Sequence, residues 1–195
     1  MGKSRLEAFS DGVIAILITI MVLELKVPNG GDLNALRPIL PHLLSYLLSF
    51  VFLAIYWNNH HHMLQATHTI NGKILWANSH LLFWLSLVPA TTAWLGDHHS
   101  EAVPAATYGV VLFFAGVAYF VLQQCIIAQE GSGSQLGRAI GNDAKGIASA
   151  SLYALGVALA FVNPVLAEAI YVAVALWWLV PDRRIESAIS SPEDE

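Results

Sequence analysis

The stretch that decides the fold is RLEAFSDGVIAILITIMVLEL, which runs from Arg5 to Leu25. It begins with charged and hydroxyl side chains and continues without a charge from Gly12 to Leu23. A run of this length is typical of a helix that crosses a bilayer, whose hydrocarbon core takes about 20 residues to span. Ionisable groups at the edge of such a helix are costly, so their presence indicates a functional role.

The composition of the whole chain indicates a membrane protein. Of its 195 residues 56% are hydrophobic and only 12% are charged, and the mean hydropathy is +0.58. With nine lysines and arginines and a net charge of −5, the chain lacks the basic surface that holds nucleic acid. Its one cysteine, Cys125, lies in an apolar run, and because the chain has no second cysteine it cannot form an intrachain disulfide.

Apolar segments of sufficient length predict an all-α membrane protein with six transmembrane helices. The predicted spans are about 9–27, 39–62, 74–95, 104–128, 147–162 and 164–180. They form one domain, 1–185, which an acidic and disordered tail, 186–195, follows. A Gly/Ser-rich link at 130–146 separates the fourth span from the fifth.

The last two spans are predicted to form an antiparallel hairpin, because little more than Asn163 and Pro164 separates them. Small residues recur every four positions along the fifth span, at Gly146, Ala150, Ala154 and Ala158. Such a stripe lets another helix approach closely.

The positive charges predict that both termini are cytoplasmic, since cytoplasmic loops carry an excess of lysine and arginine. With that orientation the far side of the membrane keeps only Lys26 and Arg37. The cytoplasmic side then holds Lys3, Arg5, Lys73, Arg138, Lys145, Arg183 and Arg184.

A helical wheel divides the first span into two faces. One stripe, at the spacing of a helix face, contains Phe9, Gly12, Ile16, Thr19 and Leu23, with Ile20 beside it and Arg5 extending it. Asp11 lies about 140° around the helix from Ile16, so it cannot share that stripe. Ordinary helix packing would also explain the apolar stripe, and the edge charges alone would suit an arginine reaching the lipid headgroups and an acid near a helix N-terminus.

The first span carries a longer motif, Arg5-x-x-x-Phe9-Ser10-Asp11, continued by Gly12-Val13-x-Ala15-Ile16-x-x-Thr19-Ile20-x-x-Leu23-Glu24. This motif resembles the signature of the bacterial branch of the TMEM175 family of potassium channels. The resemblance extends along the chain to Trp57-Asn58-Asn59-His60-His61-His62, to Trp76 and Asn78, and to Ser86-Leu87-x-Pro89. It implies a potassium-selective channel, a homotetramer in a bacterial cytoplasmic (inner) membrane, with the first helices lining the pore.

The resemblance also implies roles for individual residues. Ile16 and Leu23, with Thr19 or Ile20 between them, match the layers that form the constriction and set selectivity. A second set matches the polar motif that ties the first helix to its neighbours: Arg5, Phe9, Ser10 and Asp11, with partners Trp57, His61, Trp76 and His80. The three adjacent histidines at 60–62 leave open which one takes part.

Two other functions remain as alternatives. A secondary transporter would be expected to show broken helices and inverted repeats, which this sequence lacks. A haem-binding oxidoreductase could use histidines near one membrane edge, among them His60, His61, His62, His68 and His80. No arrangement of catalytic side chains stands out, so we expect no enzyme, no tightly bound metal and no cofactor, with K+ as the permeant ion and the lipid bilayer as the surroundings.

Overall fold

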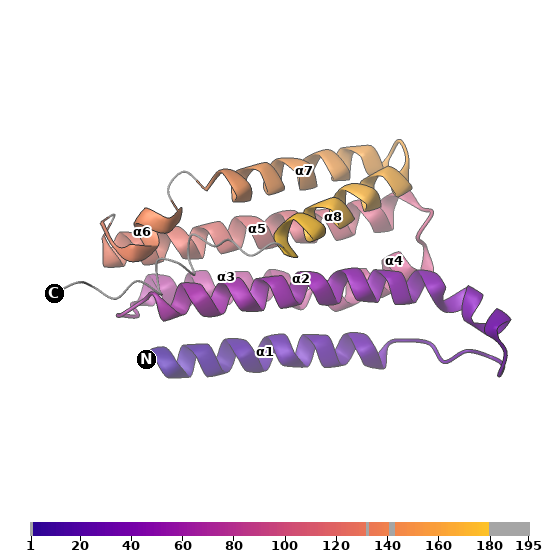
Figure 1. The fold of residues 1–195 in the computed structure, drawn as a ribbon, viewed down its shortest axis with the longest axis horizontal. Helices are drawn as coiled ribbons and strands as arrows, with labels where there is room; N and C mark the ends of the chain where they lie inside the picture. Colours follow the sequence, from indigo (N-terminus) through magenta and orange to yellow (C-terminus); the bar gives the residue numbers. More distant parts are fainter. Residues whose placement is uncertain (1, 132, 141–142, 180–195) are drawn as a thin grey trace.

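The computed structural model describes residues 2–131, 133–140 and 143–179 (Figure 1). This part of the chain is all-α and contains no β-strand. The predicted tail, 186–195, and the arginines at 183 and 184 lie outside the described residues. The helices are α1 (Lys3–Leu23), a 3-10 helix (Leu33–Ile39), α2 (Leu40–Gln65), α3 (Gly72–Ser86), α4 (Val88–Asp97), α5 (Ala102–Glu130), α6 (Gln135–Ile140), α7 (Ala144–Ala160) and α8 (Pro164–Leu179).

Four helical segments within the described part are long and apolar enough to cross a membrane. They are α1, α2 with the 3-10 helix before it, α3 together with α4, and α5. The remaining long helices, α7 and α8, are also apolar but have 17 and 16 residues.

The ends of the first helix differ from the predicted span, about 9–27. The helix begins at Lys3 and ends at Leu23, with Glu24 as its C-cap. Hydropathy marks where the bilayer begins, whereas the helix also includes the polar turns that project beyond it. At the other end Pro28 has no N–H to donate to the carbonyl of Glu24 and prevents the helix from continuing past it, but the helix already ends at Leu23.

The predicted third span, about 74–95, is two helices rather than one. α3 ends at Ser86 and α4 begins at Val88, with Leu87 between them. Pro89 occupies the first turn of α4. It cannot donate to the carbonyl of Leu85, and its ring would clash with that carbonyl in a continuous helix. The predicted link at 130–146 likewise contains a short helix, α6.

α5 lies in the middle of the bundle, between two layers of helices (Figure 1). On one side α3 and α4 pack against it, and they in turn contact α1. On the other side α7 and α8 pack against α5 and against each other. As a result α1 and α7 lie at opposite edges of the bundle (Figure 1).

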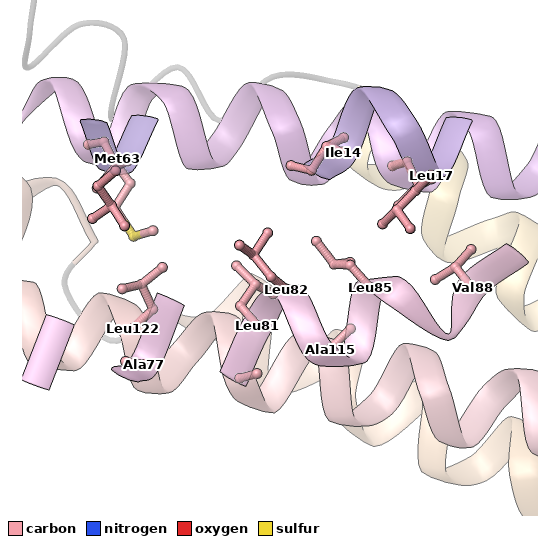
Figure 2. Close-up of a cluster of buried hydrophobic side chains, with 14 of the residues drawn as sticks. Ile14, Leu17, Met63, Ala77, Leu81, Leu82, Leu85, Val88, Ala115 and Leu122 are labelled. Atoms are coloured by element: carbon pink, nitrogen blue, oxygen red, sulfur yellow. The ribbon is translucent and has the colours of Figure 1, made fainter. Parts of the chain in front are cut away.

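Buried apolar side chains form two clusters. The first joins α1 to α2, α3, α4 and α5, and Figure 2 shows Ile14 and Leu17 of α1 beside Leu82, Leu85 and Val88. The second cluster joins α5 to α7 and α8, with contributions from α2 and α4. α1 is thus anchored by one half of the core, and the α7–α8 hairpin by the other.

Two glycines allow the α7–α8 hairpin to pack closely, and they are not the ones predicted. The ring of Tyr171 on α8 fills the space where Gly109 on α5 and Gly156 on α7 would carry a Cβ atom. Its hydroxyl donates to the backbone oxygen of Ala105 at 3.2 Å. In the predicted stripe, by contrast, Ala158 is exposed, and Gly146, Ala150 and Ala154 line a cavity rather than a helix contact.

Candidate functional site

α1 has one buried face and one exposed face. Its buried side chains are Leu6, Ser10, Ile14, Leu17 and Met21, which recur at the three- and four-residue spacing of a helix face. The opposite face carries the predicted stripe. Ile16 is 59% exposed, Ile20 40% and Leu23 78%, while Phe9, Gly12 and Thr19 are exposed as well.

Between Ile16 and Leu23, the exposed stripe carries one side-chain oxygen, the hydroxyl of Thr19. Its hydroxyl donates to the backbone oxygen of Ala15 at 2.9 Å. Because the proton is held by its own helix, the lone pairs of the Thr19 oxygen remain available to a cation or a water molecule. The stripe therefore combines exposed apolar side chains with one side-chain oxygen that can accept a hydrogen bond or contact a cation.

A buried chain of hydrogen bonds ties Ser10 to two neighbouring helices. The side-chain amide of Asn78 on α3 donates to the Ser10 hydroxyl oxygen at 3.0 Å. The same amide, through its oxygen, accepts from Nε2 of His60 on α2 at 2.7 Å. All three side chains are at most 2% exposed. The Ser10 hydroxyl also donates to the backbone oxygen of Leu6, so each polar group is paired.

A second, more exposed chain begins at Asp11. The indole N–H of Trp57 on α2 donates to the Asp11 carboxylate at 2.9 Å. The Trp57 ring stacks on His61, with 6.1 Å between ring centroids. His61 in turn accepts from the side-chain amide of Gln65 at 2.9 Å. The two chains hold α1 against α2 and α3 along the face opposite its exposed stripe.

Trp76 and His80 lie away from these contacts, although the resemblance assigned them to the same network. Trp76 is 80% exposed, and His80 accepts from the indole N–H of Trp84 on its own helix at 3.0 Å. Both positions lie about 200° around α3 from Asn78, which is the residue that faces α1. Arg5 is exposed at the start of α1.

The structure identifies His60, rather than His61, as the histidine that reaches the Ser10 side of α1. The spacing of apolar residues along α2 predicts that His60 is the buried histidine. His60 lies on the same buried face as Phe52, Leu53, Met63 and Leu64. His61 and His62 fall outside that face. The sequence motif includes Asn78 without a role, and its position on the buried face of α3 is the signal that indicates one.

A third polar group lies near the C-terminal end of α1. The Asp97 carboxylate at the end of α4 accepts from Nε2 of His42 at 2.9 Å and pairs with the ammonium group of Lys26. This contact fixes the segment after α1 to α2 and α4. Within the described ranges no group of three or more His, Cys, Asp or Glu side chains is placed to hold a metal ion.

Comparison with known proteins places these features in a family. The profile described as "Endosomal/lysosomal potassium channel TMEM175" matches residues 5–89, which include α1 and its partners on α2 and α3. A potassium channel of Chryseobacterium sp. (strain P1-3) is 53% identical over 97% of this chain and 98% of its own length. The endosomal/lysosomal proton channel TMEM175 of Bos taurus is 26% identical over 67% of this chain, which corresponds to 31% of the bovine protein.

A solved structure has the same fold. It is the crystal structure of a lysosomal potassium-selective channel TMEM175 homolog from Chamaesiphon minutus, with a TM-score of 0.82 and 26% sequence identity. The similarity covers 92% of this chain and 97% of that one. Together with the bacterial relative that is 53% identical over nearly its whole length, this match shows that the chain belongs to the TMEM175 family.

Proposed function

We propose that this protein is a potassium-selective channel in which four copies assemble around one axis and the exposed stripe of α1 lines the pore. The observation that carries the proposal is the division of α1 into two faces. One face is held by hydrogen bonds and apolar packing, and the other exposes Ile16, Ile20 and Leu23 at one edge of the bundle. The relatives named as potassium channels support the choice of ion.

The dimensions of the helices suit six crossings of a membrane. The 21 residues of α1 extend about 31 Å, which matches a hydrocarbon core of about 30 Å. The six crossings are α1, α2, α3 with α4, α5, α7 and α8. Of the last two, α7 at about 25 Å reaches the lower limit for a span, and α8 at about 24 Å is one residue below it. We place the N-terminus on the cytoplasmic side of a bacterial inner membrane, as the positive charges indicate.

The pore would select and gate by the chemistry of its layers. Four copies of Ile16 and Leu23 would form apolar rings, and a narrow apolar ring opposes ion passage by excluding water. Between them, four Thr19 oxygens would offer acceptors to a potassium ion that has lost part of its hydration shell. Conduction is then passive and follows the potassium gradient and the membrane voltage.

The polar motif would act as a clamp rather than as part of the conduction path. Ser10 and Asp11 bond to Asn78 and Trp57 on the side of α1 opposite the stripe. These contacts fix the rotation of α1 about its own axis. A helix free to rotate would not keep Ile16 and Leu23 facing a common centre.

Reconstitution of the purified protein in liposomes tests this function. With a potassium gradient and no other substrate, we expect an electrogenic potassium flux that exceeds the sodium flux under the same gradient. A pH-sensitive dye measures proton flux in parallel, because the bovine relative is named a proton channel. Absence of flux from folded oligomer, or flux that needs a coupled co-substrate, would refute the proposal, the second result in favour of a secondary transporter.

A further inference from the structure

A cavity of about 410 Å3 lies among α2, α5 and α7, with Trp178 of α8 at one edge. Its volume falls in the range of about 300–1,000 Å3 that is typical of ligand pockets. α7 and α1 lie at opposite edges of the bundle, so the cavity is separate from the proposed pore (Figure 1). Several residues of its lining are exposed, among them Phe120 and Ile147, and the cavity therefore opens onto the outside of the bundle.

The lining of the cavity changes from apolar to polar along the bundle axis. The apolar end is formed by Phe52 on α2, Phe113 on α5 and Tyr153 on α7. Toward the end of the bundle that holds the N-terminus, the same three elements contribute Asn59, Gln123 and Asp143, the N-cap of α7. From residue 113 to residue 123 of α5 the cavity extends about 15 Å. It therefore suits an elongated molecule with one apolar end and one polar end.

Gln123 is the polar side chain in this lining that most clearly points to a ligand. It is 3% exposed, and its side-chain amide makes no hydrogen bond to another residue in the described part of the chain. The Gln123 amide lines the cavity, so its N–H groups are open to whatever occupies that space. An occupant with an oxygen at this depth would accept from the amide.

The depth of Gln123 places it close to the ester region of a phospholipid, on the hydrocarbon side of that region. The 29 residues of α5 extend about 43 Å and so project beyond a hydrocarbon core of about 30 Å. With α5 centred in the bilayer at Gly116, Gln123 lies about 10 Å from the midplane, about 5 Å inside the hydrocarbon boundary. Beyond it, the ammonium group of Lys145 lies 4.4 Å from the ring centroid of Trp178, where a lipid phosphate would be attracted to it.

We infer that this cavity binds one acyl chain of a membrane phospholipid, with the ester carbonyl accepting from the Gln123 amide and the headgroup near Lys145. The apolar end, around Phe52 and Phe113, encloses the part of the chain nearest the bilayer midplane. The bound lipid fills the space between α7 and the α2–α5 pair.

Photo-crosslinking of the full-length protein in vesicles tests the inference. The probe is a phosphatidylglycerol with a diazirine on one acyl chain, and peptide mass spectrometry locates the adducts. We expect adducts to concentrate on lining residues of α5 and α7, above the level on the exposed face of α8. Gly116→Leu fills the cavity, since a Cβ at this position has its nearest neighbour at 3.8 Å, and should abolish the concentrated labelling.

A second variant acts at the polar end and is independent of the first. Gln123→Leu keeps the size of the side chain but removes the amide, and should lower retention of the same lipid by about fivefold. The matched controls are Ala128→Leu and Gln124→Leu, which change exposed positions of the same helix and should leave labelling and retention unchanged. Native mass spectrometry counts the retained lipids.

Three results would overturn the inference. One is uniform labelling over all lipid-facing helices, and another is labelling of the lining that persists in both Gly116→Leu and Gln123→Leu. The third is protection of the lining by a second copy of the chain, shown by crosslinks between subunits at Phe120 or Ile147. Because labelling and retention are measured without ion flux, they stand or fall independently of the proposed channel function.

Discussion

Replacing Asn78 with leucine should destabilise the protein by a predictable amount. Leucine has nearly the same size, but it leaves the buried Nε2–H of His60 without an acceptor and the Ser10 oxygen without its donor. A buried donor left unpaired costs about 1–3 kcal/mol. Side-chain hydrogen bonds between membrane helices average about 0.6 kcal/mol each. We therefore expect a loss of about 2 kcal/mol, or roughly 30-fold in the folding equilibrium.

The assay is the thermal unfolding of purified protein in detergent, followed at one scan rate for all variants. For a chain of this size a loss of 1 kcal/mol lowers Tm by about 2–4 °C, so Asn78→Leu should lower it by about 4–8 °C. Ser79→Ala is the matched control, because its hydroxyl is exposed and bonds only to the backbone of its own helix. That variant should change Tm by less than about 1 °C.

A double variant separates the hydrogen bonds from simple packing. In His60→Phe/Asn78→Leu no buried donor remains unpaired at this position, so the loss should be smaller than the sum of the two single losses by about 1 kcal/mol. Additive losses, or a Tm of Asn78→Leu equal to that of Ser79→Ala, would refute the role assigned to this chain of hydrogen bonds.

Two further substitutions test the packing of the bundle. Trp57→Phe keeps an aromatic ring but removes the N–H that donates to the Asp11 carboxylate on α1, and should lower Tm by about 2–4 °C. Its control, Trp76→Phe at an exposed position, should change Tm by less than about 1 °C. Gly156→Ala places a methyl group against the ring of Tyr171 and should cost about 1–3 kcal/mol, whereas Gly116→Ala adds the same group where space exists. Equal Tm values within either pair would contradict these assignments.

The two faces of α1 could be predicted from the sequence, because the hydrophobic spacing of one helix is a local property. The helical wheel separated Asp11 from Ile16, and in the structure Asp11 bonds to Trp57 while Ile16 is exposed. The family could also be predicted, since its motif is long and continuous in the chain, and the comparisons confirm it.

Contacts between helices were harder to predict, because they depend on how each helix is rotated against its neighbours. His60, His61 and His62 are adjacent in the sequence, and only the buried face of α2 distinguishes them. The stripe of small residues on α7 predicted a helix contact, but Gly146, Ala150 and Ala154 line the cavity and Ala158 is exposed. The close contact is instead at Gly156, where the aromatic ring of Tyr171 needs the space.

The most direct test of the account is the single-channel conductance of Ile16→Asn in planar bilayers. Ile16 and Leu176 on α8 are both 59% exposed in one subunit, so Leu176→Asn is a matched control. If the α1 stripe lines the pore, Ile16→Asn replaces an apolar ring with a polar one and should raise the potassium conductance several-fold or weaken its selectivity over sodium. Leu176→Asn should leave both unchanged. An unchanged conductance and selectivity in Ile16→Asn, or the same change in both variants, would contradict the assignment of the pore to α1.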